Sequence, residues 1–211
     1  MGEDSHSSGT LSVGTLLRSP TIIITLIIIA VYLLVGLAVG DLLSPVDTGI
    51  RKGSLVLFLL MQCDGPTPVF PWTIVTAIFL HENILHIASN LVFLLLFGFI
   101  LEEQVTKSRW FATFFITGIV GSLSFVALDV ASNALTGSPN PSMLDCAVGA
   151  SGAIYGIMGT AVGLKVVILL IFLLGLDIFA GGGTPAHLGG LVAGLILRKY
   201  WSLGNKSFKG I

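Results

Sequence analysis

The sequence predicts an all-α polytopic membrane protein that folds as a bundle of six transmembrane helices. Of its 211 residues, 54% are hydrophobic and only 10% are charged, whereas charged residues make up about 25% of a typical soluble domain. The mean hydropathy is +0.99. Several apolar runs approach the roughly 20 residues that a helix needs to cross a bilayer. The formal net charge of -1 provides no basic surface for nucleic acid.

The predicted spans form one membrane domain with short ends. They cover about residues 20–40, 84–103, 109–131, 149–164, 166–180 and 185–201. The first run lacks a good signal-peptide cleavage site, so we expect it to be a retained helix. Three regions follow: a flexible cytoplasmic N-terminus at 1–19, the six-helix membrane domain at 20–201 and a short cytoplasmic tail at 202–211.

The connection between the first two spans combines several prolines with the apolar run from Leu55 to Met61. That run is too short to cross a membrane, so we expect it to lie at the interface or to dip in part-way. The chain has two cysteines, Cys63 and Cys146, both in predicted outer segments. A disulfide between them and a pair of free thiols are both consistent with the sequence.

Positive charges set the expected orientation, because cytoplasmic loops carry an excess of Lys and Arg. With the N-terminus inside, the cytoplasmic segments hold Arg18, Lys107, Arg109, Lys165, Arg198, Lys199, Lys206 and Lys209. The outer segments hold only Arg51 and Lys52. We therefore expect both termini in the cytoplasm and the plasma membrane as the location. The starts of the second, fourth and sixth spans then lie on the outer side.

Each of these three starts carries polar side chains: His86 and Asn90, then Ser151, then His187. Polar groups are costly inside a membrane, which makes them functional candidates. A serine nucleophile needs a base, and acyl transfer needs hydrogen-bond donors for an oxyanion. This set offers a candidate for each role. The structural alternatives are a serine that merely packs and a His86–Asn90 pair, four residues apart on one helix face, that joins two helices.

Small residues surround the candidate serine and histidine. The predicted fourth and sixth spans carry glycines at helical spacing: Gly149, Gly152, Gly156, Gly190 and Gly194. Such faces let helix backbones approach closely, as a short serine side chain needs in order to reach an imidazole. Tyr155 lies one turn after Ser151, where it would brace the ring of His187 or simply pack. Asp177 is the nearest acidic residue, but it lies near the outer end of the fifth span, so a dyad is the simpler hypothesis.

Two other motifs fail on spacing. His81 and His86 are five residues apart, whereas a zinc-protease helix needs two histidines four apart on one face. The segment from Gly149 to Ala153 lacks the second glycine of a hydrolase nucleophile elbow. No metal or cofactor is predicted.

Taken together, the chain resembles the rhomboid intramembrane serine proteases over about residues 20–201. The matching motifs are His86 with Asn90, the run Gly149-Ala150-Ser151-Gly152, and Ala186-His187 followed by Gly190 and Gly194. His81 fits the family's usual upstream histidine. The three motifs occur in the family's order.

The resemblance implies a serine endopeptidase that cleaves transmembrane proteins in or near their membrane segments, in contact with lipid. Ser151 would be the nucleophile and His187 the general base. His86, Asn90 and the Ser151 amide would line the oxyanion hole. The long first connection would be the membrane-embedded loop of the family.

The chain departs from the family in one respect: only 35 residues separate Ser151 from His187. For the chain to cross the membrane again in the fifth span, the fourth and fifth helices must both be short. Either the turn between them is tight and the bilayer thins, or a segment is missing and the hairpin of these two helices is compromised. One rival hypothesis is therefore a catalytically impaired relative that binds transmembrane helices. The other is a small transporter that uses the histidines as proton carriers, which would predict inverted repeats that the sequence does not show.

Overall fold

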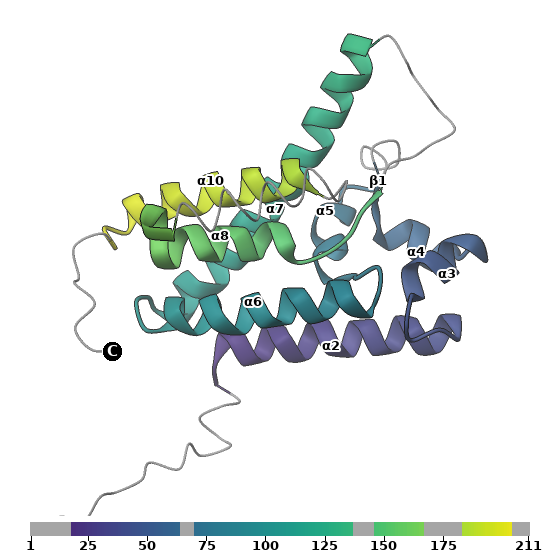
Figure 1. Cartoon of the computed structure of the whole chain (residues 1–211), viewed down its shortest axis with the longest axis horizontal. Helices are drawn as coiled ribbons and strands as arrows, with labels where there is room; N and C mark the ends of the chain where they lie inside the picture. The colour runs from purple at the N-terminus through teal and green to yellow at the C-terminus, as the bar shows by residue number, and fades with distance from the viewer. Residues whose placement is uncertain (1–17, 64–69, 137–145, 167–182, 204–211) are drawn as a thin grey trace, which may run out of the picture.

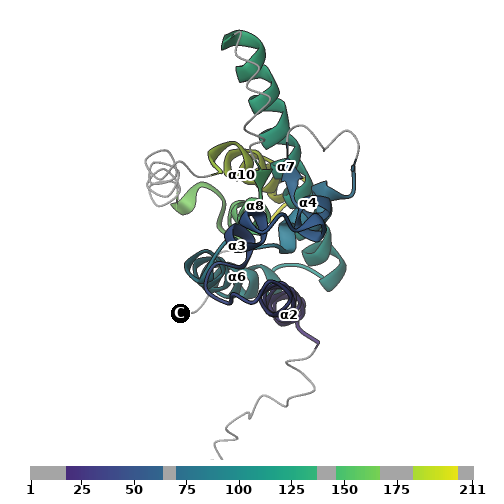
Figure 2. The same cartoon turned by 90° about the vertical axis from the view of Figure 1, so that its right-hand side faces the viewer.

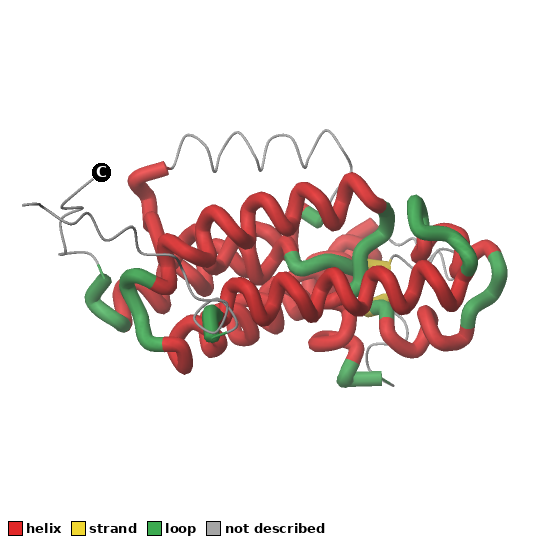
Figure 3. The backbone as a smooth tube through the Cα atoms, turned by 90° about the horizontal axis from the view of Figure 1, so that it is seen from below, coloured by secondary structure: helices red, strands yellow, loops and turns green. Residues whose placement is uncertain are grey.

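The computed structural model describes residues 18–63, 70–136, 146–166 and 183–203, and these residues are mostly helical (Figure 1). The helices are α2 (Pro20–Val39), α3 (Pro45–Arg51), α4 (Leu55–Leu60), α5 (Thr73–Thr76), η1 (Ala77–Phe79), α6 (Ile84–Glu102), α7 (Lys107–Thr136), α8 (Ser151–Val162), η2 (Gly163–Val166) and α10 (Thr184–Tyr200). Figure 3 shows one small sheet among them, formed by β1 (Gln62–Cys63) and β2 (Cys146–Ala147).

Among the described residues, three helices are long and apolar enough to cross a membrane: Pro20–Val39, Ile84–Glu102 and Lys107–Leu128. They match the first three predicted spans. The fourth predicted span is a shorter apolar helix of 12 residues, and α10, in place of the sixth, has 17. The predicted fifth span, with Asp177, lies outside the described residues apart from its first position. Residues 1–17 of the predicted N-terminal region (1–19) and residues 204–211 of the predicted tail (202–211) also lie outside them.

Helices α2 and α6 lie side by side at one face of the bundle (Figure 2). The Ser19 hydroxyl donates to the Glu102 carboxylate, whose oxygens lie 2.8 and 2.9 Å away. This contact joins the start of α2 to the end of α6. A Cβ on Gly98 would lie 2.7 Å from the Thr21 side chain, so the glycine allows the two helices to approach. The N-terminal span is thereby fixed against the span that carries His86.

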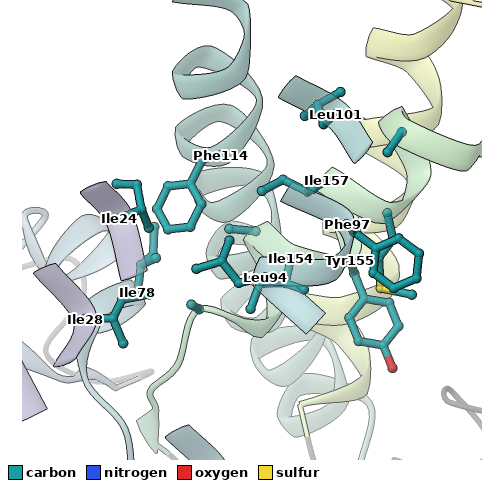
Figure 4. Packing of buried hydrophobic residues seen from close by; sticks show 14 of the residues in the cluster. Ile24, Ile28, Ile78, Leu94, Phe97, Leu101, Phe114, Ile154, Tyr155 and Ile157 are labelled. Atoms are coloured by element: carbon teal, nitrogen blue, oxygen red, sulfur yellow. The ribbon is translucent and has the colours of Figure 1, made fainter. Parts of the chain in front are cut away.

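The hydrophobic core lies where α2, α6, α7 and α8 meet, as Figure 4 shows for Ile24, Leu94, Phe114 and Ile157. Trp110 is fully buried near the start of α7, and its indole nitrogen donates to the carbonyl oxygen of Gly98 at 2.9 Å. Burying an indole is favourable only when its N–H finds an acceptor. This contact therefore anchors α7 on α6 below the candidate site.

Helix α8 is the centre of the bundle, and every residue from Gly152 to Val162 is buried. It packs against α10, α7 and α6. A Cβ on Gly190 or Gly194 of α10 would collide with the α8 backbone at Gly152 and Gly156 respectively. The two backbones touch at these glycines, as the small-residue spacing predicts. We call this contact between α8 and α10 the glycine seam.

The far ends of α8 and α10 are held by polar side chains. The Arg198 guanidinium donates to the carbonyl oxygens of Thr160 at 2.7 Å and Ala161 at 2.8 Å. The Gln104 amide donates to Ala161 O at 3.0 Å. These donors satisfy carbonyls at the end of α8 that have no partner within the helix. Helices α8 and α10 are thus joined at both ends and run parallel.

The small sheet joins the long connection between α2 and α6 to the segment that precedes α8. In the antiparallel ladder, Gln62 faces Ala147 and Cys63 faces Cys146. Cys146 is disulfide-bonded, and Cys63 is the only other cysteine of the sequence. Of the two states that the sequence left open, the structure has the bridge. The apolar run from Leu55 forms the short helix α4, beside α3 and α5.

Candidate active site

Ser151 and His187 meet at the start of the glycine seam. Ser151 is the first residue of α8, and His187 lies in the first turn of α10. The Ser151 Oγ and His187 Nε2 atoms are 2.6 Å apart, a hydrogen-bond distance. Because Gly190 brings the two backbones into contact one turn below, the short hydroxyl reaches the imidazole. The arrangement is that of a nucleophile beside its base.

Tyr155 packs against the imidazole. Its ring stacks on that of His187 with centroids 4.5 Å apart and planes 5° from parallel. Each of the two side chains is only 8% exposed. The parallel rings restrict rotation of the imidazole, so that Nε2 stays directed at the hydroxyl. Asp177 lies outside the described residues, and no role is assigned to it.

Gly149 shapes the turn that leads into Ser151. Its φ of +124° lies in a region that favours glycine, and a Cβ would lie 2.8 Å from His86 Nε2. The Gly149 N–H donates to Ala77 O at 2.9 Å, which fixes the turn against η1. The backbone at Gly149 can therefore approach the His86 imidazole this closely only because glycine has no side chain.

His86 and Asn90 lie on the first turns of α6, beside this turn. The Asn83 side chain caps α6 by accepting a hydrogen bond from His86 N at 2.9 Å. The Asn90 amide donates to His86 O at 2.9 Å, and its side chain is 5% exposed. His86 Nδ1 is buried and has no hydrogen-bond partner in the part of the chain that the structure describes. Both residues line the same cavity as Ser151.

His81 lies behind His86. It is 1% exposed, and its ring meets that of His86 edge-on with centroids 5.2 Å apart. The amide of Ala150 is directed at His81 Nε2 at 3.5 Å. His81 thus supports both the imidazole of His86 and the backbone immediately before Ser151.

The cavity in front of the dyad has a volume of about 1100 Å³. Ser151, His187, His86 and Asn90 line it. Among the described residues, no group of three His, Cys, Asp or Glu side chains could hold a metal ion. The chemistry available here is that of a hydroxyl, an imidazole and nearby hydrogen-bond donors.

The cavity-lining residues that were not predicted from the sequence include the polar residues Asp47, Gln62 and Glu82. Gln62 is 1% exposed, and its amide donates to Ser122 O of α7 at 2.7 Å. The one feature of the sequence that could have drawn attention to Gln62 is its position next to Cys63, a candidate for a disulfide. Asp47 and Glu82 are charges next to apolar segments, and nothing in their spacing relates them to Ser151.

Several curated rhomboid proteins are similar to this chain. Rhomboid-like protease 3 of Toxoplasma gondii is 30% identical over 149 residues, which are 62% of this chain and 52% of that protein. Rhomboid protease GluP of Bacillus subtilis (strain 168) is 30% identical over 139 residues, 58% of this chain and 24% of that protein. RHOMBOID-like protein 6, mitochondrial, of Arabidopsis thaliana is 33% identical over 143 residues, 60% and 42% of the respective chains.

The chain spans about half the length of these relatives or less. A profile of the Rhomboid domain matches residues 70–203, which include every candidate site residue named above except Asp47 and Gln62. With three apolar helices of spanning length among its described residues, the chain is an integral membrane protein. The predicted resemblance is confirmed: this chain belongs to the rhomboid family.

Proposed function

We propose that the chain is an intramembrane serine endopeptidase that hydrolyses peptide bonds in or near the transmembrane segments of other proteins. The observation that carries the proposal is the 2.6 Å separation of Ser151 Oγ and His187 Nε2 beside a cavity that both residues line. The relatives named as rhomboid proteases support the same activity.

The proposed reaction begins when Ser151 Oγ attacks the scissile carbonyl carbon and His187 Nε2 accepts the hydroxyl proton. For this, the imidazole carries its resting proton on Nδ1 and presents a lone pair from Nε2. The Ser151 amide, the His86 side chain and the Asn90 amide would stabilise the oxyanion. His187 then protonates the leaving amine. A water molecule next attacks the acyl-enzyme, and His187 again accepts the proton and returns it to Ser151.

The accompanying proposals concern the membrane. The substrates are transmembrane proteins that reach the site within the lipid, and water reaches it through the cavity that Ser151 and His187 line. The chain crosses the plasma membrane six times with both termini in the cytoplasm. Three apolar helices of spanning length, and α6, α8 and α10 starting at one cavity, support this arrangement.

A serine-directed fluorophosphonate probe tests the catalytic proposal. The full chain in detergent is expected to be labelled and to cleave a transmembrane substrate. Ser151→Ala is expected to lose both properties, and His187→Ala to lose cleavage, with little change in thermal stability because neither side chain holds the seam together. Failure of the probe to label the parent chain, together with absent cleavage, would favour the catalytically impaired relative instead.

A further inference from the structure

Gln62 of β1 is a buried polar side chain that the proposed chemistry does not use. It lines the candidate active-site cavity and is 1% exposed. Its amide nitrogen donates to the carbonyl oxygen of Ser122 on α7 at 2.7 Å, whereas its side-chain oxygen Oε1 accepts no hydrogen bond from the part of the chain that the structure describes. Because a carbonyl can only accept, the contact with Ser122 identifies the nitrogen end of the carboxamide. The free end is therefore the hydrogen-bond acceptor.

The carboxamide of Gln62 is held from two sides. Its backbone pairs with Ala147 of β2, four residues before Ser151 in the sequence. Its amide nitrogen is bound to α7 through Ser122. The oxygen is therefore fixed in the wall of the cavity before any ligand binds, and a side chain that is already ordered loses little entropy when it forms a hydrogen bond.

The anchor on α7 lies beside both helices of the dyad. Ser122 follows Gly121, where a Cβ would lie 2.8 Å from Ala186 O and 3.3 Å from Gly152 Cα. Ala186 directly precedes the histidine of the dyad, and Gly152 directly follows its serine. The wall that carries the Gln62 side chain is thus next to the catalytic pair.

A peptide in this cavity would supply the donor that the free oxygen needs. In a transmembrane helix, each backbone N–H is bonded within the helix. To bring a scissile carbonyl to Ser151 Oγ, the segment must leave the helical conformation locally, which frees N–H groups that need new acceptors. An acceptor that is already buried forms such a bond without a further cost of desolvation.

We infer that Gln62 is a substrate-binding residue, whose Oε1 accepts a hydrogen bond from one backbone N–H of the peptide close to the scissile bond. The inference rests on the proposed function, since it takes the cavity as the peptide-binding cleft. It also defines a specificity of the site. Proline has no N–H, so the chain disfavours substrates with proline at that one position.

Backbone ester substitution tests the inference without catalysis. The full chain with Ser151→Ala is placed in phosphatidylcholine nanodiscs, and the binding of labelled transmembrane peptides of one sequence is measured. In each peptide, one backbone N–H of the outer half is replaced by an ester oxygen. At one position the ester is expected to weaken binding about three- to tenfold, the usual effect of one hydrogen bond. If no position is sensitive, the inference is overturned.

Variants of the same protein assign this sensitivity to Gln62. With Gln62→Met added, the amide and ester peptides should bind equally at the sensitive position. Gln62→Glu retains an acceptor oxygen and should retain the preference for the amide. Gln104→Met is the matched control, because the Gln104 amide also donates to helix carbonyls, those of Ile100 and Ala161, but does not line the cavity.

The ratio of the two affinities separates substrate binding from a structural role. If Gln62 only fixes the connection to α7, or only holds a water molecule, Gln62→Met changes the binding of both peptides alike and leaves their ratio as in the parent. That result would refute the assignment. The Gln104→Met protein should keep the full ratio, and loss of the ratio in this control would equally refute it.

The proposed function is decided by a separate measurement, cleavage of the all-amide peptide by the chain with Ser151 intact. If this peptide is not cleaved but the Ser151→Ala protein shows the Gln62-dependent preference, the endopeptidase proposal fails and the binding inference stands. If the peptide is cleaved but no ester position depends on Gln62, the binding inference fails and the endopeptidase proposal stands.

Discussion

Gly149 occupies a position that no side chain fits, because its φ is +124° and a Cβ would lie 2.8 Å from His86 Nε2. We predict that Gly149→Ala removes most of the cleavage activity. The added methyl group would displace the His86 imidazole and strain the turn that presents the Ser151 hydroxyl. The rate constant kcat/KM for a transmembrane substrate measures the effect.

Gly53→Ala is the control for backbone strain. Gly53 also has a positive φ, +67°, but a Cβ there would meet nothing within 4 Å. Both substitutions place alanine in an unfavourable backbone region, and only the one at Gly149 intrudes on the candidate site. Activity lost equally in both variants would mean that strain, and not contact with His86, is responsible.

Asn90→Ala is predicted to lower kcat with a modest effect on KM. An oxyanion donor matters mainly in the transition state, and its loss costs about a hundredfold to a thousandfold in a well-studied serine protease of another family. The Asn90 amide donates to His86 O in the structure, so the substitution also removes one helix contact. Unchanged turnover with a lower thermal stability would show that the His86–Asn90 pair is structural.

At this scale the sequence was most informative about residues whose chemistry is unusual for their surroundings. Ser151, His187 and Asn90 are polar groups in apolar helices, and helical spacing alone related them to the small residues around them. Glu82 and Gln62 could not be predicted in the same way. Both residues lie in the connection between α2 and α6, whose sequence has no periodic pattern. The course of this connection depends on tertiary contacts, such as the hydrogen bond from the Gln62 amide to Ser122 O.

Among the helices, the glycine seam is the element contact on which the site depends. We predict that Gly190→Leu abolishes cleavage, because the backbone of Gly152 lies where the new side chain would begin. Helices α8 and α10 would separate by more than the reach of the hydroxyl. Val192→Leu, at a position of the same helix that is 47% exposed, is the control and should retain activity. Full activity of Gly190→Leu would contradict the close approach of the two backbones.

The β1–β2 ladder is the second contact between elements that bears on the site. Cys146 is disulfide-bonded and lies five residues before Ser151, with the Gly149 turn between them. We predict that Cys146→Ser lowers the free energy of unfolding by about 2–4 kcal/mol, the usual contribution of a native disulfide. Thermal unfolding under non-reducing conditions measures this. A reducing agent should destabilise the parent chain similarly and leave the variant unchanged; a reductant effect on both would point to another cause.

Predictions from the sequence were better for helices than for the segments between them. Apolar length gave α2, α6 and α7, and glycine spacing gave the seam, because both are local and periodic. The bridge could not be decided, since two cysteines far apart in the sequence meet only when the first connection folds back on the segment before α8. The outer connection has no period, so its short helices α3, α4 and α5 were not individually predicted.

In the molecule as a whole, the described contacts place the N-terminal ends of three helices at the same end of the bundle. Helices α6, α8 and α10 all start at the cavity that holds His86, Ser151 and His187. The opposite ends of α8 and α10 meet at Arg198, whose guanidinium binds carbonyls of α8. At that end the Arg109 guanidinium also lies 5.6 Å from the ring centre of Trp201. Arg109 and Arg198 thus lie at the end of the bundle away from the cavity, where a cytoplasmic surface is expected.

This asymmetry predicts the outcome of a topology experiment. Alkaline phosphatase, which is active only outside the cytoplasm, should be active when inserted after Gly53 and inactive when fused after Ile211. Green fluorescent protein, which fluoresces when fused on the cytoplasmic side, should give the opposite pattern. The physical reason is that Arg109, Arg198 and Lys199 hold their end of the bundle on the inner side of the membrane. Gly53 lies in the long connection between α2 and α6, which borders the cavity at the other end. An active phosphatase at both positions would mean an even number of crossings between them, whereas five of the six proposed spans follow Gly53, and it would therefore contradict the six-span topology.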